Sequence, residues 1–411
     1  MKKLVFAVAL SLISAVCATA QEYMYVWQYG GYVKYDRAEV GDMVFSMEGT
    51  NVNIGGTIYN VSSIDSITFL PPALDKSGKV VVSYSDGKAS VHVPSNVKGV
   101  TYSIEGAHVT LNSTNVTDEL EYVLEGRSGD GSLLYNGDYK CKFYLNGLDL
   151  VSSSGPAIDL ECGKRIELIL PEGTENRLED CAGGTHKAAL YCDGHLEIEQ
   201  GGHLTVAGKT GHAISTNEYM KVKKTTGTIT VTEAVKDGFH CGQYFQMNGG
   251  SVSISGNMGD CIQAELTKNP LDELNGQLIV NGGTLDLTVA GNDVKGLKAD
   301  RNITISGGDI NIDVPGNGSK GISTNVHLFV NENEAPTDID ITAGGGTFVD
   351  PETDDTKYCM GIKVDFNMTV EAGHIKVVNT GEQSRGIKVE GTYTNKDGTV
   401  DAEIEAGTVA Q

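Results

Sequence analysis

The chain has little proline, few aromatic residues and, beyond its first residues, no apolar stretch long enough to cross a bilayer. Among 411 residues there are 9 prolines and 1 tryptophan, and aromatic residues make up 7%. Apolar residues do not recur at the spacing of an amphipathic helix. Scarce proline with 52 glycines and many Val, Ile and Thr residues argues against disorder and favours strands joined by tight turns. We therefore expect an all-β protein without a membrane span.

Positive charge is also scarce. The chain carries 31 lysines and arginines against 54 acidic residues, which gives a net charge of -23. A field of this sign repels nucleic acid, so we predict no nucleic-acid partner. The excess of carboxylates makes calcium, a hard cation that prefers oxygen ligands, the natural counter-ion, although acidity also serves solubility alone.

The N-terminus has the pattern of an export signal. Two lysines at positions 2 and 3 precede an apolar run over residues 4–16, and Ala-Thr-Ala at 18–20 offers a cleavage site. This pattern predicts a signal peptide over residues 1–20, too short for a membrane span, and hence a secreted protein. An alternative is lipidation of Cys17, against which the bulky residue before it argues. Seven of the 8 cysteines follow the signal, and their spacing defines no disulfide pairing.

A small module is expected before the main domain. Residues 23–27 and 32–35 are rich in tyrosine and valine and flank a Gly-Gly turn, which predicts a β-hairpin. The module closes with a strand-like segment at 64–69, and two prolines at 71–72 mark its boundary. We therefore assign residues 21–72 to a separate β module that caps the main domain.

A repeat dominates the rest of the chain, from residue 75 to residue 411. An apolar residue that usually follows glycine or alanine recurs at intervals of about 24 residues, with three longer intervals that we attribute to surface loops. We call these the ladder residues: Ile158, Leu190, Ile214, Phe239, Ile262, Leu297, Ile322, Ile362 and Ile387. One such interval is the length of one coil of a parallel β-helix, which we predict for this domain.

The neighbours of the ladder residues support the same fold. The residue two positions later is small or apolar, and the residue between is polar in almost every coil. This alternation is typical of a strand with one buried face. Cys192 and Cys241 occupy the inward position, so we expect both to fill the core. Gly-Gly turns lead a further strand in several coils, as at 248–254 and 306–312.

Three segments carry a family resemblance: LNGLDL at 145–150, GPAIDL at 155–160 and LPEGTENRLED at 170–180. On these segments and the later Gly-Ile rungs, residues 75–411 resemble exported bacterial carbohydrate-binding domain-containing proteins with a pectate-lyase-like, right-handed β-helix. The DSITF segment at 65–69 is similar to a short leader module of exported Bacteroidetes proteins. The resemblance implies calcium-associated binding of an acidic polysaccharide such as polygalacturonate. It also implies a protein that is secreted from a Gram-negative bacterium or held at its envelope or surface.

A basic stripe is the first candidate site. Cations gather in the last coils, either two residues before a ladder residue or directly after it, so stacking should align them along one side. These candidate polysaccharide-binding residues are Lys295, Lys298, Lys320, Lys363, Arg385 and Lys388. Such a stripe suits an extended polyanion, and the alternative is a solvated face that relieves like-charge repulsion.

A carboxylate cluster is the second candidate. We predict Asp237, Asp260, Asp293 and Asp300 as calcium ligands, because carboxylates on adjacent coils lie close enough to share one ion. The alternative is that these residues cap backbone groups in stacked turns.

The third candidate is catalytic. Residues 293–301 place lysines and an arginine beside carboxylates, as β-elimination of a uronate requires, but an exposed lysine among carboxylates has a raised pKa and makes a poor base. No phosphate-binding loop or serine-histidine-acid pattern is present. We therefore predict a non-catalytic binder of acidic polysaccharide, with a polysaccharide lyase and a surface adhesin or spacer as alternatives.

Overall fold

The computed structural model describes residues 23–28, 31–69, 71, 73–267, 269, 271–333 and 335–410. The predicted signal peptide and Cys17 lie outside the described residues. The described residues form two compact units, which divide between residues 73 and 74. In the described part, no helix is long and apolar enough to span a membrane.

The first unit consists of two small antiparallel sheets. The predicted hairpin is formed by β1 (Tyr23–Gln28) and β2 (Gly31–Asp36), and β6 (Ser66–Thr68) pairs with the other edge of β1. The second sheet contains β3 (Val44–Ser46), β4 (Asn51–Ile54) and β5 (Thr57–Asn60), and α1 (Arg37–Val40) is a single helical turn. Five buried residues from both sheets of the first unit form an apolar core that is separate from the core of the second unit: Met24, Val26, Val52, Ile54 and Tyr59.

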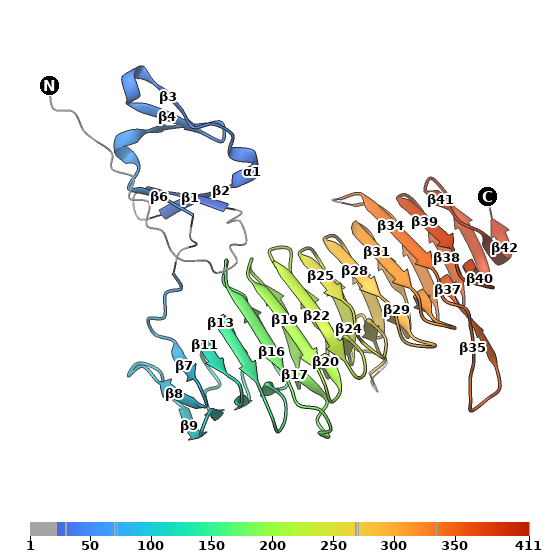
Figure 1. Cartoon of the computed structure of the whole chain (residues 1–411), viewed down its shortest axis with the longest axis horizontal. Helices are drawn as coiled ribbons and strands as arrows, with labels where there is room; N and C mark the ends of the chain where they lie inside the picture. Colours follow the sequence, from blue (N-terminus) through green and yellow to red (C-terminus); the bar gives the residue numbers. More distant parts are fainter. Residues whose placement is uncertain are drawn as a thin grey trace. The chain divides into compact units, whose positions relative to one another are not determined.

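The second unit is a parallel β-helix, as predicted. Figure 1 shows its coils stacked in chain order from β13 to β42. Its strands form three parallel stacks around one apolar core. The stack that contains the ladder residues, called here the ladder face, consists of β10 (His108–Ser113), β12 (Ser132–Gly137), β14 (Ile158–Glu161), β17 (Ala188–Cys192), β20 (His212–Thr216), β23 (Phe239–Cys241), β26 (Ile262–Ala264), β29 (Lys295–Ala299), β32 (Lys320–Thr324), β37 (Met360–Val364), β40 (Arg385–Asn395) and β42 (Ile404–Ala410).

The other two stacks complete each coil. The second face contains β7 (Val80–Ser85), β11 (Leu120–Ser128), β13 (Cys141–Val151), β15 (Arg165–Ile169), β18 (His195–Glu199), β21 (Met220–Val222), β24 (Tyr244–Met247), β27 (Gln277–Val280), β30 (Ile303–Ile305), β33 (His327–Val330) and β38 (Asn367–Val370). The third face begins in the later halves of β11 and β13 and continues through β16 (Glu175–Glu179), β19 (His203–Gly208), β22 (Thr228–Ala234), β25 (Ser251–Ile254), β28 (Thr284–Thr288), β31 (Gly308–Val314), β34 (Thr337–Ala343), β39 (His374–Asn379) and β41 (Thr399–Asp401).

The ladder predicted from sequence is confirmed residue by residue. Ile158 pairs with Leu190, Leu190 with Ile214, and the register continues without slip to Ile387. It also extends beyond both ends, through Leu133 to Val109 before Ile158 and to Ile404 after Ile387. The ladder therefore fixes which side chains share each outward column of the face.

Close backbone approach explains why glycine precedes so many ladder residues. A Cβ at Gly296 would lie 2.5 Å from the carbonyl oxygen of Gly321, and one at Gly321 would lie 2.7 Å from that of Gly361. Real Cβ atoms do not approach backbone oxygen so closely, so larger residues would force these coils apart.

Two antiparallel features depart from the regular parallel coils. β8 (Lys88–His92) pairs antiparallel with β7, and β9 (Val100–Glu105) pairs antiparallel with β10, so these two strands cover strand edges at the N-terminal end of the β-helix. The longest insertion, between Ile322 and Ile362, contains the hairpin of β35 (Thr347–Val349) and β36 (Thr356–Tyr358).

Candidate functional site on the ladder face

The outward column directly after the ladder residues organises the site. Its members are in register along the stack: Asp159, Tyr191, Ser215, His240, Gln263, Lys298, Ser323, Lys363, Lys388 and Glu405. Several hollows lie along this column, including a groove around His240 and a groove around Lys363. Because Gln263 pairs with Lys298, the two grooves belong to consecutive coils of one face.

The groove around Lys363, called here the basic groove, has a volume of about 830 Å³. It is lined by all six residues of the predicted basic stripe, and the insertion hairpin adds Lys357 and Tyr358 to its wall. Its lining contains seven cations and four carboxylates, those of Asp293, Asp355, Asp365 and Glu390, so the formal charge of the lining is 7 − 4 = +3. Two further carboxylates pair with lining cations from outside the groove, Asp260 with Lys298 and Glu405 with Arg385. A positive groove on a chain of net charge -23 is a local reversal of the overall field.

Ion pairs hold most of these cations in place. Lys363 Nζ lies 2.7 Å from Asp365 Oδ1, and Lys388 Nζ lies 2.9 Å from Glu390 Oε1. The Arg385 guanidinium lies 3.7 Å from the centre of the Tyr358 ring, a cation–π contact. The cations are therefore positioned before any ligand arrives, and Lys363, Lys388 and Arg385 stay partly exposed.

Lys320 corrects the expectation that every member of the stripe faces solvent. Its side chain is only 7% exposed, and its Nζ bonds the carbonyl oxygen of Gly318 at 2.5 Å and Asp293 Oδ1 at 3.0 Å. The insertion hairpin packs closely on the backbone at Gly318, two residues before Lys320. A Cβ at Gly318 would lie only 2.6 Å from the Cβ of Phe348. Burial lowers the pKa of Lys320, against the opposing effect of Asp293.

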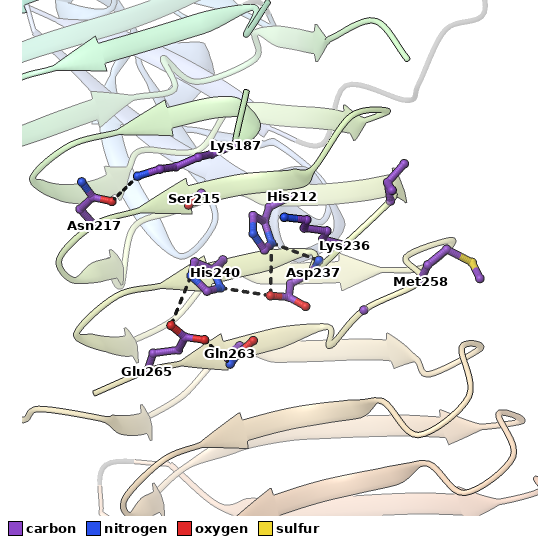
Figure 2. Close-up of a pocket in the computed structure, with 12 residues that line it drawn as sticks. Lys187, His212, Ser215, Asn217, Lys236, Asp237, His240, Met258, Gln263 and Glu265 are labelled. Carbon is purple, nitrogen blue, oxygen red and sulfur yellow. Dashed lines mark hydrogen bonds and ion pairs between the residues drawn. The ribbon is translucent and has the colours of Figure 1, made fainter. Parts of the chain in front are cut away.

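The groove around His240, called here the histidine groove, has a volume of about 560 Å³. Figure 2 shows His212 and His240 converging on the carboxylate of Asp237. Asp237 Oδ2 lies 3.2 Å from His212 Nδ1 and 3.1 Å from His240 Nδ1, and the two imidazole rings stack with centroids 4.3 Å apart. Burial acts to raise the pKa of Asp237, but the contacts with His212 and His240 outweigh it and hold that pKa below its ordinary value.

Asp260 links the two grooves. Its backbone N–H donates to Asp237 Oδ1 at 2.8 Å, and its own Oδ1 accepts from the backbone N–H of Lys295 at 2.7 Å. Its Oδ2 pairs with Lys298 Nζ at 3.1 Å. Burial raises the pKa of Asp260, although Lys298 and Lys295 oppose the shift. The predicted neighbours Asp237 and Asp260 therefore do lie together.

The other two predicted calcium ligands lie elsewhere. Asp293 precedes β29 and pairs with Lys320 and Lys295, whereas Asp300 follows β29 and accepts a hydrogen bond from Leu266 N–H at 3.1 Å. The five residues of β29 separate them by roughly 16 Å, so they do not share an ion. The four carboxylates do not meet at one oxygen-lined point, and calcium binding by any of them stays a prediction.

The histidine pair was missed by sequence reasoning. His212, Asp237, Asp260, Lys295, Lys320 and Arg385 all stand two residues before a ladder residue. Reading that column in full would have placed His212 next to Asp237. His240 occupies the polar position directly after the ladder residue Phe239, and a single histidine in that column gives no reason to expect a partner from the preceding coil.

The cysteines behave as predicted for the core. Cys192 and Cys241 are fully buried. All seven cysteines within the described ranges are free thiols.

The first coils of the ladder face are acidic. Burial and the carboxylate of Glu161 raise the pKa of Asp159 from 3.8 to about 6. A carboxyl group whose pKa is raised on folding favours the folded state while protonated, and this contribution is lost as the pH rises from about 4 to about 6. Asp159→Asn should therefore stabilise the protein at pH 7.5, by about 1 kcal/mol after allowance for solvent screening.

Urea unfolding midpoints at pH 7.5 and pH 4.5 check this expectation. The gain should largely vanish at pH 4.5, and Asp340→Asn, which removes an exposed carboxylate from the third face, should show no comparable difference. A gain that is equal at both pH values would contradict an electrostatic origin.

Comparison with known proteins agrees with this architecture. The solved structure of a polysaccharide lyase-like protein from C. thermocellum, a gadolinium derivative, superposes with a TM-score of 0.51 at 21% identity, covering 62% of this chain and 97% of that chain. At this identity the likeness shows the shared fold alone. No curated protein sequence matches the chain. The family model described as "Carbohydrate-binding domain-containing protein" matches residues 105–407, which include both grooves. The chain belongs to this family of carbohydrate-binding domain-containing proteins.

Proposed function

We propose that the protein binds an acidic polysaccharide along the basic groove, without cleaving it. The observation that carries this proposal is the +3 formal charge of the groove on a strongly acidic chain. Strands of neighbouring coils are about 4.8 Å apart, so the groove presents cations repeatedly along the stacking direction. A polymer with a carboxylate on each sugar, such as polygalacturonate, offers charges that repeat in the same way.

We extend this proposal to calcium and to location. Asp355, Asp365 and Glu390 line the same groove, and calcium would bridge such carboxylates to those of the polymer, because it takes six to eight oxygen ligands. The predicted signal peptide supports a place of action outside the cell, secreted or at the surface of a Gram-negative bacterium.

A lyase activity is the second candidate, and Lys320 is the observation that favours it. Its buried amine lies in the wall of the basic groove, and its lowered pKa is the property that a general base needs. Its amine is nevertheless paired with Asp293 and almost fully covered, which favours the binding function.

One experiment separates these functions. Purified protein is mixed with polygalacturonate, with calcium or with a chelator, and gel retardation is followed together with the ultraviolet absorbance of unsaturated product. We expect retardation that weakens with added salt, is stronger with calcium and occurs without growth in absorbance. Growing absorbance would establish the lyase instead, and absence of retardation in both conditions would exclude this polymer as the ligand.

A further inference from the structure

The histidine groove contains a donor set that does not suit calcium. One ligand atom from each of His212, Asp237 and His240 lies within 4.8 Å of the other two. His212 begins β20, Asp237 stands in the turn before β23, and His240 is the central residue of β23. Their positions therefore follow from the register of adjacent coils and not from a mobile loop.

The hydrogen bonding around Asp237 indicates that a positive charge is needed there. When His212 is neutral, its Nδ1 accepts a hydrogen bond from the backbone N–H of Asp237 at 3.2 Å and faces Asp237 Oδ2, a second acceptor, at 3.2 Å. A proton on Nδ1 would turn this contact into an ion pair. A cation bound to both atoms would remove their repulsion, in exchange for a hydrogen bond at the long end of the usual range.

His240 is placed as metal-ligating histidines are. Its Nδ1 faces Asp237 Oδ2 at 3.1 Å, while its Nε2 lies 3.7 Å from Glu265 Oε2. Glu265 is held in turn by a 2.8 Å hydrogen bond from Gln263 Nε2. A carboxylate that accepts a hydrogen bond from the second ring nitrogen orients a ligating imidazole and raises its basicity, and Glu265 faces that nitrogen at ion-pair distance. Asp237 has comparable support, because its Oδ1 accepts the N–H of Asp260.

We propose that His212, Asp237 and His240 bind a zinc-class divalent transition ion, with Glu265 positioning His240. Two imidazole nitrogens and one carboxylate suit zinc, whereas calcium takes oxygen ligands. Zinc–ligand distances near 2.05 Å in a tetrahedron put ligand atoms roughly 3.3 Å apart, close to the two separations from Asp237 Oδ2. The groove leaves a fourth position open to water or to an oxygen of a sugar ligand.

Metal titration of the purified full chain after chelator treatment tests this proposal. Zinc should bind with one equivalent at micromolar affinity or better, in competition with a chromophoric chelator, and far more tightly than calcium. Cobalt, used as a spectroscopic probe, should give the visible bands of nitrogen and oxygen coordination without the near-ultraviolet band of thiolate ligands. His240→Ala should weaken zinc binding at least 100-fold, and Glu265→Gln roughly 10- to 100-fold.

A matched control is available on the third face. His374 pairs with Asp338 at 2.8 Å, so His374→Ala removes one histidine from a single histidine–carboxylate pair and should leave zinc binding unchanged. Equal zinc affinity in wild type and His240→Ala would overturn the proposal, as would calcium binding that depends on Asp237 but not on the histidines. Glu265→Gln changes a side chain that is 43% exposed, so it keeps the test valid if His240→Ala does not fold.

Discussion

Replacing Lys363 and Lys388 together by alanine is expected to weaken polygalacturonate binding about 10-fold or more. Both lysines line the basic groove, each held by a carboxylate two residues later. Their loss lowers the formal charge of the groove from +3 to 5 − 4 = +1 and leaves Asp365 and Glu390 unpaired. A hydrogen bond to a charged group contributes about 1.5–3 kcal/mol. The net contribution of each lysine to polymer binding is smaller, because each lysine is already paired with a carboxylate of the protein.

Affinity electrophoresis over a range of polymer concentrations measures the effect. The control is Lys88→Ala with Lys376→Ala, which makes the same change in net charge at exposed positions on β8 and β39, away from the groove. Glutamate in place of Lys363 and Lys388 turns the groove to 5 − 6 = −1 and should abolish retardation at low salt. If the control pair weakened binding as much as the groove pair, overall charge and not the groove would attract the polymer.

The fold was predictable because the repeat reports on a short-range packing constraint. Strands on adjacent coils meet in register, so each coil must put a residue of similar character at the ladder position, with a small residue before it. Cys261 shows that glycine is not an absolute requirement there: it takes the place that glycine has in the neighbouring coils and is fully buried. The coils around Leu133 and Ile404 escaped detection because their flanking residues depart from the Gly-Ile pattern.

The parts of the site that follow from the register of the coils could be predicted from the sequence. The parts that depend on an insertion, or on a contact between side chains of two different columns, could not. Lys298, Lys363 and Lys388 fall in one column, so the ladder alone placed Lys363 beside Lys388, with Lys298 two coils before Lys363. The burial of Lys320 depends on the hairpin of β35 and β36, whose fold over the groove the repeat does not encode. Asp293 and Asp300 are close in sequence but stand at the two ends of a strand, which makes them distant in space.

Phe143→Ala is expected to lower the free energy of unfolding by about 3–5 kcal/mol, the largest stability effect that we predict. Phe143 is fully buried near the N-terminal end of the β-helix. Its ring stacks on Tyr122 with centroids 4.8 Å apart and meets Tyr135 edge-on at 5.1 Å. Removal of the ring leaves a cavity between two tyrosines that are themselves fixed in adjacent strands, and such a site collapses poorly.

Urea unfolding followed by circular dichroism and by tyrosine fluorescence measures this effect. Phe366→Ala is the matched control, because it deletes the same side chain where 55% of the residue is exposed, and it should cost less than about 1 kcal/mol. In a stack of coils each coil contacts only its neighbours, so the end of the β-helix that contains Tyr122, Tyr135 and Phe143 can unfold before the rest. A shift in fluorescence ahead of circular dichroism would reveal such local unfolding, and equal midpoints for both variants would show that Phe143 contributes no special packing.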